Sequence, residues 1–144
     1  MLSIYFLSEP QNHRCCYCGH QMVEICIQTL PFVTRNAMTR EHVICRSYGG
    51  ETTKDNLVAA CRMCNELRGN MDAIAFYNLL QKWFKRDETL RERWHHITID
   101  EYRHFKLSCL RTQERHLRGL ARRSIEYAYR HHTFICHNQE RLRA

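Results

Sequence analysis

The sequence predicts an α+β fold, in which a small core of two short strands and a helix precedes a helical extension. Three observations favour this class. Residues 39–60 contain two short apolar runs of strand length, and residues 62–68 follow them with a helical composition. Two Cys-x-x-Cys pairs frame this region. Beyond residue 70, apolar residues recur at steps of three and four, which is typical of amphipathic helices.

The N-terminal part is expected to contribute two strands and the first cysteine pair. Residues 2–7 form a short apolar run rich in Ile, Tyr and Phe, which predicts an edge strand. Residues 22–33 are apolar and β-rich, and predict another strand. Between them, the order Cys15-x-x-Cys18-Gly19 predicts a tight turn that directs two thiolates to one point, with the glycine supplying the backbone freedom.

The central region predicts a hairpin followed by a helix. Residues 39–44 resemble a short strand that leads into a turn at residues 47–50, and residues 56–60 form a second short apolar run. Residues 62–68 predict a helix of about two turns, which Gly69 ends at the position after the last carbonyls. The expected local order is therefore strand, strand, helix.

The C-terminal half predicts two helices. The first covers about residues 72–86, with Asp72 as its N-terminal cap. The second begins with the capping-box pattern Thr98-x-x-Glu101 and extends to about His132. Because no Gly-, Pro- or Ser-rich linker separates the two halves, we expect the helices to pack on the core.

The second of these helices has two predicted faces. The apolar side holds Tyr102, Cys109, Leu117, Leu120 and Ala128. The opposite side is a basic ridge made of His104, Arg111, Arg115, Arg118 and Arg122. The ridge predicts a surface that follows a phosphate backbone, and the alternative is an ordinary solvated helix face.

The charge distribution also favours a polyanionic partner. The formal net charge is +7 at pH 7. Residues 1–70 hold seven Lys/Arg against six Asp/Glu, whereas residues 71–144 hold fifteen against nine, so most of the surplus lies outside the central region. Lys and Arg that neutralise phosphates release condensed counterions, which favours nucleic acid as the partner. Solubility alone remains the simpler explanation of the charge.

Cysteine content and hydropathy suggest where the protein works. The first residues lack the basic segment and the long apolar segment of a secretory signal peptide. Nine cysteines without an export signal indicate reduced thiols and bound metal rather than a disulfide scaffold. No run of about 18 apolar residues is present, so we expect no membrane-spanning segment. A cytoplasmic protein is the expectation.

The two cysteine pairs predict a structural zinc site. Cys15, Cys18, Cys61 and Cys64 supply the four thiolates that a closed tetrahedral Zn²⁺ site requires. Unmetallated buried thiols are the alternative. Cys16 is a possible first ligand with poorer spacing. The remaining cysteines are expected to be packed thiols: Cys26, Cys45, Cys109 and Cys136.

Together these residues resemble a known family. The ordered elements are Glu41-His42-Val43, Gly49-Gly50, Asp55-Asn56-Leu57, Cys61-x-x-Cys64-Asn65 and Arg68-Gly69. They are similar to the HNH endonuclease family, in its zinc-containing form with Asn at the third signature position. The resemblance covers about residues 15–70. It implies a ββα-metal (His-Me finger) core in residues 1–70, with residues 71–144 as a helical extension packed on it.

The resemblance also implies roles for single residues in the hydrolysis of phosphodiester bonds in DNA. His42 would be the general base, since an imidazole titrates near neutral pH. Glu41 and Asn65 would bind a catalytic Mg²⁺ or Mn²⁺ through oxygen. Asn56 would bond the backbone across the loop and fix the geometry of His42. Arg68 would hold a phosphate.

Two residues depart from the family pattern, and two other functions stay open. Many relatives place Asp where this chain has Glu41, and often Pro where it has Cys45. One alternative is a zinc-knuckle nucleic-acid adaptor that has lost cleavage through Glu41. Another is a structural zinc module that binds a protein. The resemblance does not choose among restriction, homing, phage-packaging and toxin roles.

Overall fold

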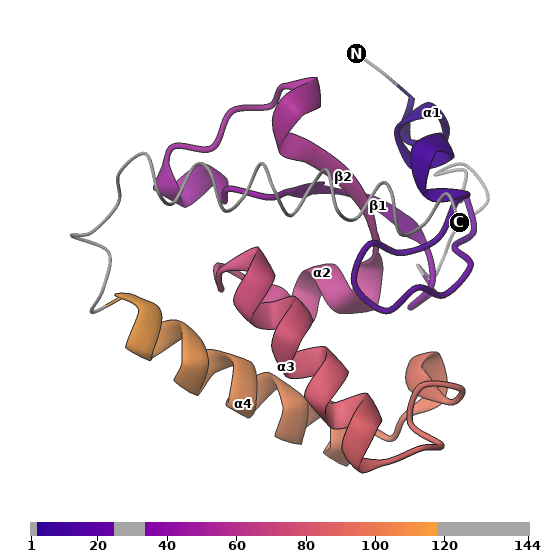
Figure 1. The fold of residues 1–144 in the computed structure, drawn as a ribbon, viewed down its shortest axis with the longest axis vertical. Helices are drawn as coiled ribbons and strands as arrows, with labels where there is room; N and C mark the ends of the chain where they lie inside the picture. Colours follow the sequence, from indigo (N-terminus) through magenta and orange to yellow (C-terminus); the bar gives the residue numbers. More distant parts are fainter. Residues whose placement is uncertain (1–2, 25–33, 118–144) are drawn as a thin grey trace.

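A computed structural model describes residues 3–24 and 34–117 (Figure 1). The elements in chain order are α1 (Ile4–Ser8), η1 (Glu9–Gln11), β1 (Met38–His42), η3 (Arg46–Tyr48), η4 (Lys54–Asn56), β2 (Leu57–Cys61), α2 (Arg62–Arg68), α3 (Ala73–Arg86), η5 (Trp94–His96) and α4 (Ile99–Leu117). Within these ranges, the helices are too short or too polar to cross a bilayer. The predicted α+β class is confirmed.

The centre of the fold is a hairpin followed directly by a helix. β1 and β2 pair antiparallel, from Met38 opposite Cys61 to His42 opposite Leu57. α2 begins at the next residue, where the Cys61 sulfur caps it by accepting a hydrogen bond from the Cys64 amide at 3.4 Å. Gly69 ends α2 with a positive φ of 55°, a conformation that other residues rarely adopt. The predicted order of strand, strand and helix is confirmed.

The predicted edge strand at residues 2–7 is wrong, because the described part of this segment forms the short helix α1. The Ser3 side chain caps this helix by accepting a hydrogen bond from the Tyr5 amide. The free edge of β2 is already occupied. Gln11 donates to the Ala59 carbonyl at 2.8 Å and accepts from the Ala59 amide at 2.9 Å, as a neighbouring strand would.

The strand expected at residues 22–33 falls mainly outside the described residues, which stop at residue 24 and resume at residue 34. The described part makes one isolated bridge, in which Val23 pairs in parallel with Ala37. This bridge holds the segment after the first cysteine pair against the start of β1.

The two predicted C-terminal helices are present, with the expected caps. The Asp72 carboxylate accepts a hydrogen bond from the Ala75 amide and begins α3. Thr98 and Glu101 form the predicted capping box at the start of α4, since each side chain accepts a hydrogen bond from the other's backbone amide at 3.1 Å. The expected end of this helix near His132 lies outside the described residues.

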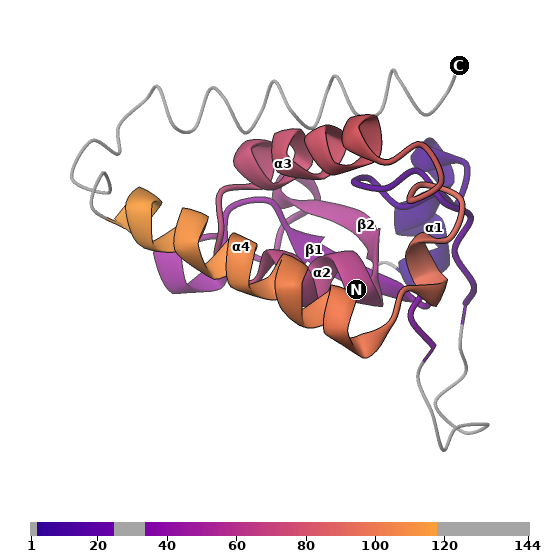
Figure 2. The same ribbon diagram turned by 90° about the horizontal axis from the view of Figure 1, so that it is seen from below.

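One hydrophobic core joins the hairpin to the helices that follow it. Figure 1 shows α2 between the hairpin and α4, and in the perpendicular view of Figure 2 the strands lie between α3 and α4. Trp94 is fully buried at the centre of the helical part, where the rings of Trp83, Phe84 and Phe105 surround it. Helix α4 therefore supports α2 from the side opposite the hairpin.

Candidate active site and metal centre

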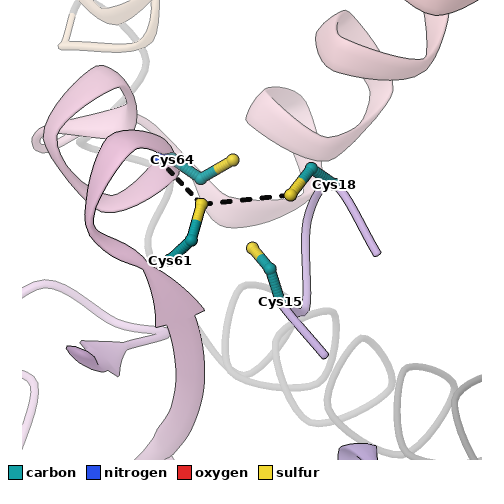
Figure 3. Close-up of side chains that lie close together, drawn as sticks. All are labelled: Cys15, Cys18, Cys61 and Cys64. Carbon is teal, nitrogen blue, oxygen red and sulfur yellow. Dashed lines mark hydrogen bonds between the residues drawn. The ribbon is translucent and has the colours of Figure 1, made fainter. Parts of the chain in front are cut away.

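Four cysteine thiols meet in the interior between the N-terminal turn and the start of α2. The sulfurs of Cys15, Cys18, Cys61 and Cys64 all lie within 4.8 Å of one another, and all four residues are buried. Figure 3 shows the four side chains directed at one centre. A tetrahedral zinc ion with Zn–S distances of about 2.3 Å holds its sulfurs roughly 3.8 Å apart. The Cys18–Cys61 separation of 3.9 Å therefore fits zinc.

The environment of these thiols favours a bound cation. Backbone or ring N–H groups donate to three of the sulfurs: Tyr17 to Cys15, Cys64 to Cys61, and the Trp94 indole to Cys64, each at 3.4 Å. Such donors stabilise thiolates. Burial, however, raises the pKa of the Cys61 and Cys64 thiols well above the usual value. The pKa of the Cys15 thiol is lowered well below the usual value, so the four thiols do not share one direction. A bound metal ion would favour the thiolate form of all four, and the donor set suits zinc.

The remaining cysteines divide as expected where the structure describes them. Cys16 is buried but does not belong to the four-sulfur group. Cys45 and Cys109 are buried thiols within the fold. Cys26 and Cys136 lie outside the described residues.

The side chains of β1 alternate between two faces of the hairpin. Thr39 and Glu41 lie on the face covered by α2, which contacts both of them. Arg40 and His42 lie on the other face, and Arg40 is exposed. The side chains of Glu41 and His42, the last two residues of β1, therefore point to opposite faces of the hairpin.

Glu41 is a buried carboxyl group with one engaged oxygen. Its residue is only 5% exposed, and Oε1 lies 3.0 Å from Nη1 of Arg68. Oε2 is buried as well and makes no hydrogen bond of ordinary geometry with the described residues. Burial raises the pKa of Glu41 to about 7, although the charge of Arg68 works in the opposite direction. The Tyr17 side chain also interacts with this carboxyl group and works against the rise in pKa. A carboxylate oxygen at this position is of the type that a divalent cation such as Mg²⁺ prefers.

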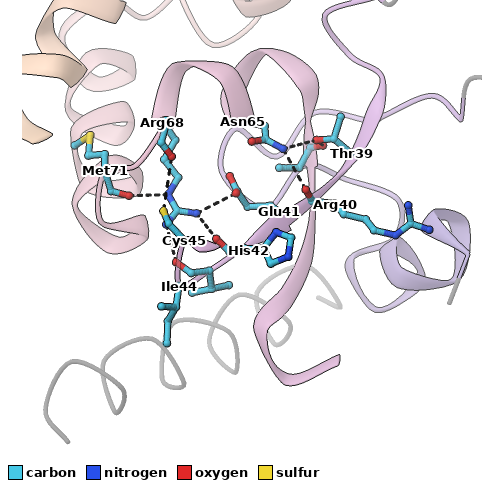
Figure 4. Close-up of polar contacts among 12 residues, drawn as sticks. Thr39, Arg40, Glu41, His42, Ile44, Cys45, Asn65, Arg68 and Met71 are labelled. Atoms are coloured by element: carbon cyan, nitrogen blue, oxygen red, sulfur yellow. Dashed lines mark hydrogen bonds and ion pairs between the residues drawn. The ribbon is translucent and has the colours of Figure 1, made fainter. Parts of the chain in front are cut away.

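Arg68 has a different role from the predicted one. Its side chain has no exposed surface, and it donates to the carbonyls of His42 and Val43 at 2.6 Å and of Met71 at 2.7 Å. Figure 4 shows its guanidinium held between Glu41 and this backbone. The expected phosphate contact of Arg68 is therefore wrong in this structure, because a fully enclosed guanidinium does not reach a nucleic-acid backbone. Arg68 fixes α2 to the end of β1.

Asn65 lies one helical turn before Arg68 on the same side of α2. Its amide nitrogen donates to Oγ1 of Thr39 at 2.9 Å and to the carbonyl of Arg40 at 3.2 Å. These two bonds fix the orientation of the amide and leave its oxygen out of both (Figure 4). Asn65 and Glu41 therefore both bring oxygen to the junction between β1 and α2.

His42 is the last residue of β1 and is half-buried. Its Nε2 atom lies 3.0 Å from Oγ1 of Thr52, in the loop between the two strands. Burial lowers the pKa of the His42 imidazole, and the positive charges of Arg46 and Arg68 lower it further. The lowered pKa favours the neutral ring, which is the form that accepts a proton.

Asn56 closes the loop that follows β1. Its Oδ1 accepts from the Ile44 amide at 2.8 Å, and its Nδ2 donates to the carbonyls of Ile44 at 3.1 Å and Glu51 at 2.9 Å. Its own carbonyl accepts from the Val43 amide at 2.9 Å. These bonds hold the backbone immediately after His42.

Gly50 lies where this loop comes closest to the strand end. A Cβ atom at this position would sit 1.8 Å from the carbonyl oxygen of Ile44, so only glycine fits. Its amide donates to the Cys45 carbonyl at 3.0 Å. The close approach keeps the loop compact beside His42.

Comparison with known families agrees with this geometry. Residues 15–71 match the model of the HNH endonuclease family. The similarity is confined to this segment. The match runs from the first zinc ligand to the residue before the cap of α3, about two fifths of the chain. Comparisons with curated proteins and with solved structures gave no match. The assignment relates the chain to nucleases and nucleic acid.

Outside the matched segment, the predicted basic ridge is described only in part. His104 and Arg111 are exposed on α4. Arg115 is part of α4, where the structure describes its backbone. Arg118 and Arg122 lie outside the described residues. On the apolar side of α4, Cys109 is 1% exposed and Tyr102 is partly buried, as expected. Leu120 and Ala128 lie outside the described residues.

The sequence patterns did not point to several residues that build the candidate site. Thr39 holds the Asn65 amide, Thr52 contacts the His42 ring, and Trp94 donates to a zinc-site sulfur. Thr39 carried a usable signal, because it lies two residues before Glu41 and so shares its strand face. No sequence pattern indicates the roles of Thr52 and Trp94, since their positions depend on how distant segments pack.

Proposed function

We propose that this chain is a metal-dependent endonuclease that hydrolyses phosphodiester bonds in DNA, with His42 as general base. The observation that supports this most is the arrangement at the end of β1. The Glu41 carboxyl group and the Asn65 amide lie on the face covered by α2, and the His42 ring lies on the other face of β1 beside Thr52. Oxygen ligands beside an imidazole suit phosphodiester hydrolysis.

The buried carboxylate and the amide oxygen suit Mg²⁺ or Mn²⁺. A divalent ion held by Glu41 and Asn65 would polarise the scissile phosphate and stabilise charge on the leaving oxygen. Glu41 reaches such a site with Oε2, while Arg68 retains Oε1. Arg68 therefore acts as a positioning residue that orients the carboxylate.

His42 would take a proton from the attacking water. As the water oxygen bonds to phosphorus, the bond from phosphorus to the leaving sugar oxygen breaks, and that oxygen gains a proton from solvent. In-line displacement requires the nucleophile and the leaving group on opposite sides of phosphorus. A phosphate lying across the end of β1 would meet this condition, since Glu41 and His42 leave the strand on different faces.

Zn²⁺ at Cys15, Cys18, Cys61 and Cys64 would have a structural role. The ligands join the N-terminal turn to the first turn of α2, which carries Asn65. A closed four-thiolate site leaves no position for substrate, so zinc would hold the scaffold rather than take part in the reaction.

We also propose that two parts of the chain have different functions. Residues 1–70 would be the HNH nuclease core, and residues 71–144 a helical extension whose basic ridge follows the DNA backbone. The DNA-binding residues of the ridge would be its arginines, Arg111, Arg115, Arg118 and Arg122. The charge surplus of residues 71–144 supports this division, because phosphate contacts supply most of the affinity of non-specific DNA binding.

A plasmid-nicking assay tests the proposal. The zinc-loaded chain should convert supercoiled DNA to the open-circular form when Mg²⁺ or Mn²⁺ is added, and His42→Ala should not. The control is Arg103→Gln, which changes a side chain that is 74% exposed on α4. Equal cleavage by the wild type and His42→Ala would remove His42 from the mechanism.

A second function is favoured by one contact. The ion pair between Arg68 and Glu41 occupies part of the carboxylate that a catalytic ion would need. If this ion pair prevents the Glu41 carboxylate from binding a divalent ion, the chain would be a zinc-containing nucleic-acid adaptor that does not cleave. DNA binding with no nicking in Mg²⁺, Mn²⁺ or Ca²⁺ would favour the adaptor.

A further inference from the structure

A cavity of about 310 Å³ opens between α2 and α4, away from the residues of the candidate active site. It is lined by Arg35, Arg62, Met63, Glu66, Ile99 and Tyr102. Two guanidinium groups and one carboxylate face it, so the lining has an excess of positive charge. Its size is at the lower end of small-ligand sites.

Arg35 is held in place before any ligand arrives. Its Nη1 atom donates to the carbonyl of Ile97 at 2.7 Å and to that of His95 at 3.4 Å. Its guanidinium carbon lies 5.9 Å from the centre of the Tyr102 ring, in cation–π range. An arginine that is already fixed loses less entropy when it binds an anion.

Arg62 lines the cavity together with Arg35. Its side chain is 39% exposed and lies 2.9 Å from Glu66 in an ion pair along one face of α2. Exposed pairs of this kind contribute little to stability, so a stronger anion can replace the carboxylate. Ile99, which is 58% exposed at the rim, offers an apolar contact.

The cavity lies beside the proposed path of the substrate. Arg62 and Asn65 are three residues apart on α2, so they share a face and are separated by about 4.5 Å of helix rise. Successive phosphates of one strand advance by about 3.4 Å along a duplex. A strand whose scissile phosphate lies at Asn65 therefore brings a neighbouring phosphate to Arg62.

We propose that the Arg35–Arg62 cavity binds a phosphate of the substrate strand one or two nucleotides from the cleaved bond. This inference rests on the proposed nuclease function and names a subsite for it. Arg35 supplies a fixed guanidinium, and Arg62 leaves Glu66 to close on the same phosphate. Ile99 contacts the adjoining sugar. The site recognises the backbone and carries no base specificity.

The test measures the affinity of the zinc-loaded chain for a fluorescein-labelled random-sequence DNA duplex, in a buffer prepared without Mg²⁺, Mn²⁺ or chelator. Arg62→Gln should weaken binding about tenfold near 0.1 M salt and reduce the slope of log K against log[salt] by about one. Glu66→Gln should strengthen binding, because the competing carboxylate is gone. Arg103→Gln, which removes the same charge from an exposed position outside the cavity, should change affinity less than twofold.

A double-mutant cycle with Arg35→Gln completes the test. If both arginines bind one phosphate, the double variant should lose less affinity than the product of the two single losses. Zinc content and the unfolding midpoint of each variant establish that it is folded. A wild type that binds and nicks DNA, with Arg62→Gln no weaker than Arg103→Gln, would overturn this inference alone. A wild type with no DNA affinity would overturn the proposed function as well.

Discussion

Arg68 and Glu41 form a buried ion pair, 3.0 Å apart, at the point where α2 meets the end of β1. The guanidinium also donates to the carbonyls of His42 and Val43. This single side chain therefore fixes the backbone at His42 and one oxygen of Glu41 at once. Both consequences can be measured.

The first prediction concerns stability. Arg68→Ala leaves a buried carboxyl group and several carbonyls without their donor, so it should lower the free energy of unfolding by about 3–5 kcal/mol. Urea unfolding of the zinc-loaded protein measures this loss. Arg62→Gln, which breaks an exposed pair on the same helix, should cost less than about 1 kcal/mol. A stable Arg68→Ala variant with weakened DNA binding would instead restore a phosphate-binding role.

The second prediction concerns zinc. The purified chain should hold about one equivalent of zinc, and Cys64→Ser should lose both the metal and the cooperative unfolding transition, since ligand and fold are coupled. Elemental analysis and circular dichroism make the comparison. Cys109→Ser changes a buried thiol outside the four-sulfur group and should keep the metal. Full zinc content in Cys64→Ser would contradict the assigned ligands.

The third prediction concerns Asn56. Asn56→Ala removes the side-chain hydrogen bonds to the Ile44 and Glu51 backbone. Each backbone group that stays buried without its partner should lower the free energy of unfolding by roughly 1–3 kcal/mol. We expect nicking to fall at least a hundredfold, because the backbone after His42 loses its anchor, while zinc content stays unchanged. Asn56→Asp keeps the acceptor for the Ile44 amide and should lose less. Unchanged nicking in Asn56→Ala would show that this loop does not position the base.

The fourth prediction concerns pH. Burial and two nearby arginines lower the pKa of His42, so the ring loses its proton at a lower pH than an ordinary histidine, whose pKa is about 6.5. The nicking rate at saturating Mg²⁺ should therefore remain high down to pH 6.5 and fall only below it. A pH–rate profile between pH 5 and 8 measures this limb. If the nicking rate already fell above pH 7 at every Mg²⁺ concentration, the pH dependence would belong to a group other than His42.

Part of this site could be predicted from the sequence because local signals agree there. The two Cys-x-x-Cys pairs, the Thr98–Glu101 capping box and the glycine after residue 68 each depend on neighbours only a few residues away. The structure confirms all three. The order of β1, β2 and α2 follows from the same kind of local pattern.

The remaining features depend on contacts between distant segments. The run at residues 2–7 has strand composition, but a cap at Ser3 and the occupation of the β2 edge by Gln11 make its described part helical. From the sequence alone, an arginine such as Arg68, in the last turn of a short helix, is expected to be exposed. It is buried because the carbonyls of residues 42 and 43 turn toward α2, which no local pattern specifies.

The most direct test of the account is the binding of Mn²⁺ to the zinc-loaded chain, measured by isothermal titration calorimetry with nicking assayed on the same samples. We predict one Mn²⁺ site in the wild type, loss of that site in Asn65→Ala, and retention of the site without nicking in His42→Ala. This pattern would separate the metal ligands from the base. Equal Mn²⁺ binding by the wild type and Asn65→Ala, or nicking that survives in His42→Ala, would contradict it.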